Sequence, residues 1–258
     1  CGYGLANESN AGANASGWAN VFSMVDGNTE AVFVTLYNDI ATGGVPDFSK
    51  NNSWEHGIRP SNAMGGGGKT PSAMMVDMFP MADGKRPSTC NTYTTLEQSS
   101  VAYDKNVPFA NRDPRFYATI FCPGTEYPCS DVLTDDMKYW NAWKLMADEG
   151  SSTGYKYVTL IQDQLNKGIG GNSSGYYQKK GLDPDLTQAT VYDADIDWIE
   201  IRFAEVLMNY GECANELGKS GEALQVLYDI RKRAGIESST GNYGVTATSQ
   251  SDIREAYI

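Results

Sequence analysis

The sequence predicts a mainly α-helical, loop-rich fold, which contains a pair of antiparallel helices and a few short β-strands. Three observations predict it. Apolar residues recur at helical spacing between residues 198 and 236. The 27 glycines among 258 residues indicate long irregular segments. Short stretches such as 30–37 and 157–162 have the composition typical of strands.

The helical pair is predicted over residues 198–217 and 221–234. Asp197 can cap the first helix, and Gly218 and Gly235 stand where helix ends require positive φ. Basic residues close the second helix, where they suit the negative end of its dipole. The spacing assigns the following apolar side chains to the buried face of the pair, together with a buried, inert Cys213: Phe203, Leu207, Tyr210, Leu224, Leu227 and Ile230.

Before this pair, loops alternate with short elements. Residues 38–69 contain Gly, Asn, Pro and Ser without periodicity, which predicts a long loop. Residues 70–79 predict a short helix that Thr70 caps, with Pro71 at its first position. Its packing face is predicted to comprise Met74, Met75, Met78 and Phe79.

Three further segments have local signals. Residues 112–121, RDPRFYATIF, predict a turn and a short strand, with Arg112 and Asp113 as a local ion pair. Trp140 and Trp143 have the spacing of one packed helical face. Residues 237–250 are polar and predict a loose loop before the start of a helix at DIREAYI.

Charge and composition exclude several classes of partner. A net charge of −12 argues against nucleic acids and anionic membrane surfaces, which both require basic patches. No stretch of about 18 apolar residues predicts a transmembrane helix. Cys122 and Cys129, in CPGTEYPC, allow either a disulfide, worth about 2–3 kcal/mol in the chain-entropy model, or two free thiols.

No motif predicts a cofactor, a metal site or a catalytic residue. Residues 63–70, AMGGGGKT, lack the first glycine of a phosphate-binding loop, and Pro71 removes an N–H group that a phosphate would use. Residues 193–197 read D-x-D-x-D, but Trp198 and Ala204 occupy positions where a calcium loop needs Gly and Glu. His56 is the only histidine, so no multi-histidine metal site can form.

The remaining candidates for ligand binding are aromatic and polar residues in one loop. Trp54 can stack on the apolar face of a sugar ring, whose hydroxyl groups pair with amide and guanidinium groups. The alternative is that Trp54 anchors its loop against the helices. Trp18 is the next candidate for a stacking platform, and the other candidate ligand-binding residues are Phe48, Asn51, Asn52 and Arg59.

Four segments together resemble the SusD/RagB family of surface nutrient-binding lipoproteins. They are the helical pair, TPSAMMVDMFPMADGKRP at 70–87, NRDPRFYATIFCPG at 111–124, and GYYQKKGLD at 175–183. The resemblance implies a tetratricopeptide-like helical scaffold, with a loop-rich lobe at 1–190, the hairpin at 195–236, and a loop and truncated helix at 237–258. Both ends resemble internal positions of the family, so we expect a fragment, and we expect Cys1 to be an ordinary residue rather than a lipidated one.

The resemblance also implies a function. Members of the family bind oligosaccharides, and some bind peptides, at the outer face of the outer membrane, where an N-terminal lipid anchors them. They deliver the ligand to a SusC-like TonB-dependent transporter without chemistry. The alternatives are a tetratricopeptide-like module that binds a protein or peptide without a sugar site and, third, a hydrolase that uses two carboxylates.

Overall fold

The computed structural model describes the backbone of residues 2–7, 11–39, 41–42, 45–46, 50–59, 69–89, 94–104, 107–122, 125–126, 131, 143–147, 149–150, 155–159, 176–187, 190 and 192–257. Its first elements are the 3-10 helices η1 (Ala13–Ala15) and η2 (Asn20–Phe22), with α1 (Ser16–Ala19) between them. The other helices are α2 (Ser53–Ile58), α3 (Ala73–Asp77), α4 (Pro114–Thr119), α6 (Phe203–Glu216), α7 (Ser220–Arg233) and α8 (Gln250–Tyr257). The strands are β1 (Ala31–Thr35), β2 (Ala41–Thr42), β3 (Val45–Pro46), β4 (Trp143–Ala147), β5 (Tyr155–Thr159) and β6 (Trp198–Arg202).

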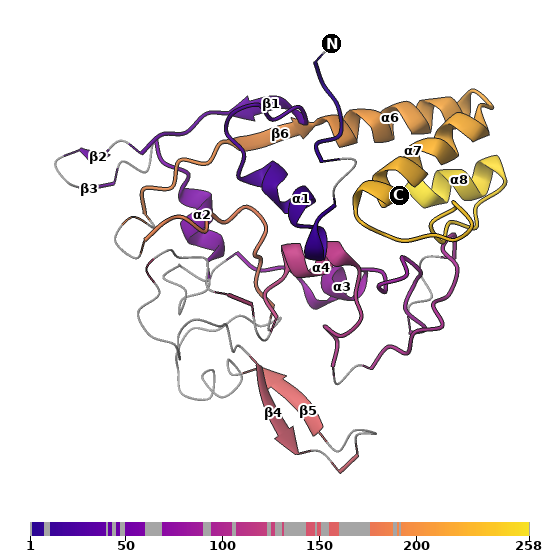
Figure 1. Ribbon diagram of the computed structural model, residues 1–258, viewed down its shortest axis with the longest axis horizontal. Coiled ribbons are helices and arrows are strands. Elements are labelled where there is room, and N and C mark those ends of the chain that lie inside the picture. The colour runs from indigo at the N-terminus through magenta and orange to yellow at the C-terminus, as the bar shows by residue number, and fades with distance from the viewer. Residues whose placement is uncertain are drawn as a thin grey trace.

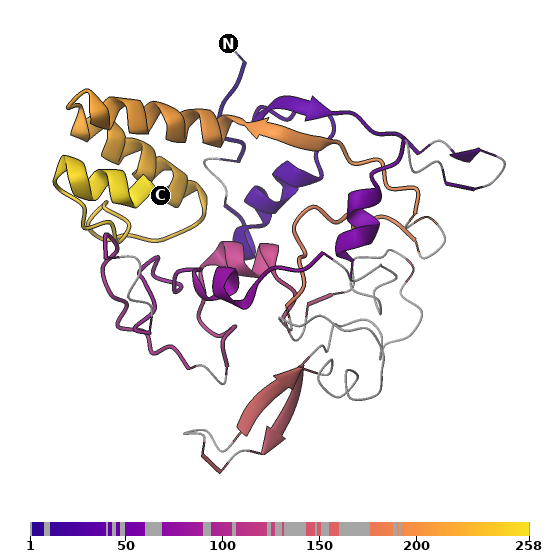
Figure 2. The ribbon, with the colours of Figure 1, turned by 180° about the vertical axis from the view of Figure 1, so that it is seen from behind.

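These elements form the predicted mainly helical fold. Helices α6, α7 and α8 pack together at one end of the molecule, and the antiparallel ribbon β1–β6 leads away from them (Figure 1). Helices α1, α3 and α4 lie below this ribbon, and α2 lies toward the opposite end (Figure 2). In the described part of the chain, no helix has both the length and the apolar composition that a membrane span requires.

The helical hairpin is confirmed, and its two ends use glycine as predicted. Gly218 has φ 76° and Gly235 has φ 83°, a conformation in which a side chain is strained. After α6, the Lys219 N–H donates to the Ala214 carbonyl at 2.8 Å and the Gly218 N–H to the Asn215 carbonyl at 3.0 Å. This Schellman pattern satisfies carbonyls that the helix end leaves without partners.

The predicted start of the first helix is wrong by five residues. Residues 198–202 form strand β6, which pairs with β1 in the register Thr35↔Trp198 and Ala31↔Arg202. Asp197 therefore caps no helix, and its carboxylate instead accepts the Tyr37 N–H at 3.0 Å. From Ile199 to Arg202 the segment alternates apolar and polar residues, and its pairing with β1 makes the extended conformation the stable one.

The predicted buried face of the hairpin is only partly correct. Leu227 is buried, whereas Phe203, Leu207, Leu224 and Ile230 are partly buried. Tyr210 is 50% exposed and its hydroxyl donates to Glu222. Cys213, predicted to be buried, is exposed.

Small residues line the face of α6 that is most deeply buried. Ala204, Gly211 and Ala214 are buried there, and α8 packs on the same face. The Tyr257 hydroxyl donates to the Ala223 carbonyl at 2.6 Å directly above Gly211. Helical periodicity marked the apolar stripe, but it could not show that α8 would select the small residues as its contact.

Helix α4 replaces the strand predicted over residues 112–121. Asp113 caps it by accepting the Arg115 N–H at 2.9 Å, and Pro114 occupies its first turn. The predicted Arg112–Asp113 ion pair is also wrong. Asp113 pairs with Arg115 at 2.6 Å, while the buried Arg112 guanidinium donates to backbone carbonyls, among them those of Pro108 and Val76.

Helix α3 is shorter than predicted, and of its predicted packing face only Phe79 packs against the core, beside Phe116. Ser72 caps it by accepting the Met75 N–H at 3.2 Å, so Thr70 is not the cap and Pro71 lies outside the helix. Val76 is buried, whereas Met74 is 74% exposed. The exposed set also includes Met75 and Met78.

The other predictions for short elements, tryptophans and cysteines are partly confirmed. The segment predicted as a loop, 38–69, contains β2, β3 and α2. The strand predicted at 157–162 is present as β5, which pairs with β4. Trp143 therefore lies on a strand rather than a helix, and Trp140 lies outside the described residues. Cys122 is a free thiol, and Cys129 also lies outside the described residues.

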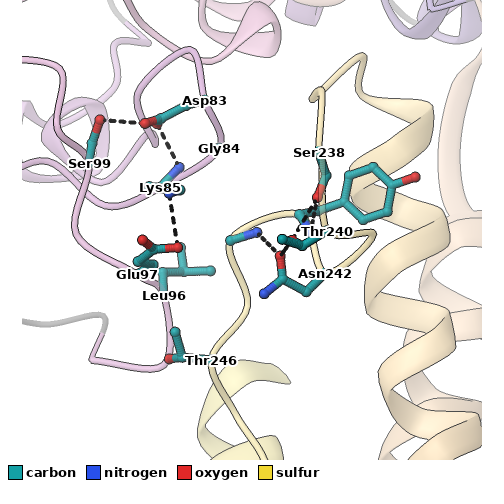
Figure 3. A network of polar contacts seen from close by, with 12 residues as sticks. Asp83, Gly84, Lys85, Leu96, Glu97, Ser99, Ser238, Thr240, Asn242 and Thr246 are labelled. Atoms are coloured by element: carbon teal, nitrogen blue, oxygen red, sulfur yellow. Dashed lines mark hydrogen bonds and ion pairs between the residues drawn. The ribbon is translucent and has the colours of Figure 1, made fainter.

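A polar network holds the loop before α8 against residues 83–99 (Figure 3). Asp83 accepts the Ser99 hydroxyl at 2.8 Å, and Lys85 pairs with Glu97 at 2.9 Å. The Glu97 N–H then donates to the Gly244 carbonyl at 2.8 Å. Hydrogen bonds therefore hold the segment 237–250 in place, and the prediction of a loose loop is wrong. A helix does follow, as predicted, at α8.

We expect Gly211→Ala to destabilise the protein by about 1–3 kcal/mol, since a Cβ there would lie 1.8 Å from the Tyr257 hydroxyl oxygen. Gly221→Ala on α7 is the matched control, because a Cβ there meets nothing within 4 Å. That change should be neutral or stabilise by about 0.5–1 kcal/mol. Urea unfolding of both variants checks the difference, and equal stabilities would refute the close contact between α6 and α8.

Candidate ligand-binding surface

Two tryptophans from distant parts of the chain meet at the surface. Trp54 in α2 and Trp198 in β6 have ring centroids 5.3 Å apart in an edge-on arrangement with an interplanar angle of 61°. They are 37% and 38% exposed. The Lys69 ammonium lies 3.8 Å from the centroid of the Trp54 ring, a distance typical of a cation–π contact. Two partly exposed indoles and a cation therefore form one surface patch, which we call the tryptophan patch.

Asparagine side chains place α2 beside the segment that leads into β6. The Asn52 N–H donates to the Ala194 carbonyl at 2.6 Å, and its side-chain amide donates to the Ile196 carbonyl at 2.7 Å. The Asn51 amide donates to the Asn38 carbonyl at 2.9 Å. Both asparagines are buried. These bonds hold the start of α2 against residues 194–196, which brings Trp54 to Trp198.

A buried ion pair fixes the other end of α2. Arg59 and Glu55, both fully buried, lie one helical turn apart with an N–O distance of 2.5 Å. The Arg59 guanidinium also donates to the Asp183 carbonyl at 2.7 Å, and Glu55 accepts the Asp183 N–H at 3.0 Å. Burial raises the pKa of Glu55 to about 7, although Arg59 opposes this shift. The pair therefore anchors α2 to residue 183.

The only histidine lies on the same helix. The rings of His56 and Tyr192 have centroids 4.3 Å apart, and Tyr192 is 41% exposed. Partial burial and then the Arg59 charge lower the pKa of His56, so the imidazole is neutral at pH 7. This pair adds a second aromatic contact between α2 and the segment that precedes β6.

The structure separates the predicted site residues into two groups. Trp54 reaches the surface, whereas Asn51, Asn52 and Arg59 are buried and bond to backbone or side-chain groups of the protein. Trp18 is also buried, in a cluster with Ala15 and Ala118. Phe48 lies outside the residues whose side chains the structure describes.

Sequence analysis missed Trp198 and Lys69. Trp198 was assigned to the start of a core helix, although the alternation in WIEIR was a signal for a strand with one exposed face. No sequence signal points to Lys69, since it lies 15 positions from Trp54 in a segment without periodicity. Its contact with Trp54 depends on the tertiary fold.

A separate cleft of about 660 Å³ lies on the other side of β6. Its lining includes Tyr3, Phe22, Val34, Leu36, Asp197 and Ile199. Side chains alternate along a strand, so Asp197 and Ile199 face away from Trp198. None of the predicted ligand-binding residues that the structure describes lines this cleft. The cleft and the tryptophan patch are therefore separate surfaces.

Among the residues that the structure describes, no three His, Cys, Asp or Glu side chains are grouped so that they could hold a metal ion. Asp193, Asp195 and Asp197 therefore form no such group. Burial and then neighbouring carboxylates raise the pKa of Asp195.

Comparison with known proteins identifies the family. The chain matches the model of the SusD family over residues 12–256, and it belongs to that family. The predicted SusD-like helical scaffold with a loop-rich lobe and short strands is thereby confirmed. Comparison with curated proteins finds no significant match.

Solved structures show the same fold. The chain is similar to a SusD-like protein from Bacteroides fragilis, with a TM-score of 0.60 and 20% identity over 99% of this chain and 44% of that one. It is also similar to a SusD-like carbohydrate-binding protein from Bacteroides fragilis, with a TM-score of 0.53 and 20% identity over 89% of this chain and 38% of that one. The chain thus spans less than half the length of either protein.

We expect Arg59→Ala to destabilise the protein by about 3–5 kcal/mol, because it leaves the buried Glu55 carboxyl and the Asp183 carbonyl without the guanidinium that donates to both. Trp54→Ala is the control from the same helix and should lower the melting temperature by only a few degrees, since its ring is partly exposed. Differential scanning calorimetry measures both. A comparable loss in the two variants would make Trp54 a structural anchor.

The raised pKa of Glu55 predicts a pH dependence of stability. The native carboxyl keeps its proton up to a pKa of about 7, whereas the unfolded one releases it near 4.5. The native state therefore binds more protons between these values, and stability falls as the pH rises through this window. Glu55→Gln cannot ionise and should flatten this fall. Identical slopes of melting temperature against pH in both proteins would contradict the assignment.

Proposed function

We propose that this chain is part of a non-catalytic surface protein that binds an oligosaccharide through the tryptophan patch. The observation that supports the proposal is the pair of partly exposed indoles at Trp54 and Trp198. Membership of the SusD family supports it as well, and one structurally similar protein is described as carbohydrate-binding.

The chemistry of the patch suits a sugar. A pyranose ring has apolar C–H faces that stack on aromatic rings, and its hydroxyl groups require polar neighbours. The two indoles provide the apolar surface, and the Lys69 ammonium lies at its edge. In this proposal Asn51, Asn52 and Arg59 support the site, because they hold α2 in place without contacting the ligand.

The proposal includes a location and a partner that follow from the family. The whole protein would be held by an N-terminal lipid at the outer face of the outer membrane. It would pass its ligand to a SusC-like TonB-dependent transporter. The net charge of −12 is consistent with a protein that does not bind nucleic acids or anionic lipids directly.

A second candidate function is a module that binds a protein or peptide through its helices. It is favoured by the exposed apolar side chains of α6 and of the residue after it, since Tyr210 is 50% exposed and Leu217 is 76% exposed. This surface lies on the hairpin, away from the tryptophan patch (Figure 1). A variant of one surface should therefore leave binding at the other unchanged.

We expect a glycan array to give at least one ligand with a dissociation constant between micromolar and millimolar, or about −4 to −8 kcal/mol. Trp54→Ala and Trp198→Ala should each weaken that binding at least tenfold in isothermal titration. Tyr210→Ala, which removes another exposed aromatic ring, should leave it unchanged.

Two results would count against this proposal. Unchanged affinity in a stable Trp54→Ala variant would place the site elsewhere, and loss of binding in Tyr210→Ala alone would favour the helical surface. The product of any ligand incubated with the protein should be analysed by mass spectrometry, because cleavage of the glycan would make the protein a hydrolase.

A further inference from the structure

The Lys69 side chain is exposed, but it lies against α2 and Trp54. The Lys69 N–H donates to the Gly57 carbonyl at 3.2 Å, which anchors its backbone to the helix. A Cβ built on Gly57 would lie 3.1 Å from Cε and 3.3 Å from Nζ of Lys69, so the side chain lies directly over this glycine. The ammonium then reaches the face of Trp54 at 3.8 Å.

The positive charge of Lys69 has no anionic partner in the described part of the chain. None of the ion pairs there includes Lys69. The carboxylates nearest in sequence to the two tryptophans have other partners. Glu55 pairs with Arg59, Asp197 accepts the Tyr37 N–H, and Glu200 accepts the Thr35 hydroxyl at 2.7 Å.

An uncompensated cation at this position is informative because the protein is acidic. With a net charge of −12, the chain as a whole repels anions. A fixed ammonium at the edge of the tryptophan patch offsets this repulsion only locally, within about one Debye length of roughly 8–10 Å. A ligand gains from Lys69 only if its own negative charge lies next to the ring that stacks on the indoles.

We propose that the ligand of the tryptophan patch is an acidic oligosaccharide, whose carboxylate or sulfate group pairs with Lys69 while an adjacent sugar ring stacks on Trp54 and Trp198. This inference rests on the proposed function and specifies its substrate class. Lys69 sets the charge preference of the site, and the indoles supply the contact that all sugars share. Carboxylate and sulfate have the same effect on an ammonium, which acts as a point charge.

The test compares ligands that differ only in charge. Oligogalacturonate is measured against its methyl ester, and chondroitin sulfate oligosaccharide against its desulfated form, by isothermal titration at 20 mM and 500 mM NaCl. At low salt we expect the charged member of at least one pair to bind five- to tenfold more tightly than its less charged counterpart. This preference should shrink at high salt, because ions screen an exposed pair. The pair that shows it identifies the anion as carboxylate or sulfate.

Variants assign the preference to Lys69. Lys69→Met keeps the aliphatic stem and removes the charge, so the preference should vanish, while Lys69→Arg should retain it. Lys232→Met changes the net charge equally at an exposed position on α7 and should also retain it. A preference that survives Lys69→Met, or less charged members that bind as tightly as the more charged ones in both pairs, would overturn the inference.

The two proposals fail in different ways. If uncharged glycans bind with an affinity that depends on Trp54, and charged ones show no advantage, the sugar site stands and the acidic ligand is rejected. If no saccharide binds, both are rejected.

Discussion

The structure depends on one buried carboxylate, that of Glu30, just before β1. It pairs with Arg202 at the end of β6 and with Arg233 at the end of α7, each at 2.5 Å, and it also accepts the Ala6 N–H. The Glu30 carbonyl accepts the first N–H of α6, from Phe203, at 2.7 Å. Removing one partner of a buried pair costs about 3–5 kcal/mol, so these bonds join the N-terminal segment to both helices of the hairpin.

This junction explains why a strand leads directly into a helix without a loop. Arg202 has extended φ and ψ and serves as the N-cap position of α6, but its side chain caps nothing because it pairs with Glu30. Strand β6 therefore pairs with β1 from Arg202 back to Trp198. The position of the tryptophan patch therefore follows from the same contact that fixes the helical hairpin.

Some polar residues near the patch hold the fold together, and others reach the surface. Asn52 and Arg59 look like ligand-binding residues in the sequence, because amide and guanidinium groups suit sugar hydroxyls. The fold instead uses them to satisfy the buried carbonyl of Ile196 and the partly buried one of Asp183, which would be costly to leave without partners. Trp54 was predictable as a candidate because it is an aromatic residue in a polar segment of the sequence. Its partners Trp198 and Lys69 were not predictable.

The sequence by itself determined the helical hairpin and its two glycine ends, because these depend on residues only a few positions apart, and it indicated the family through four local segments that occur in the expected order. Tertiary structure decided the strand at 198–202, since its partner β1 lies more than 160 positions earlier. It also decided that Tyr210 faces solvent and that α8 covers Gly211 instead. Periodicity shows that a helix has an apolar stripe, but only the packed neighbours determine which part of that stripe is buried.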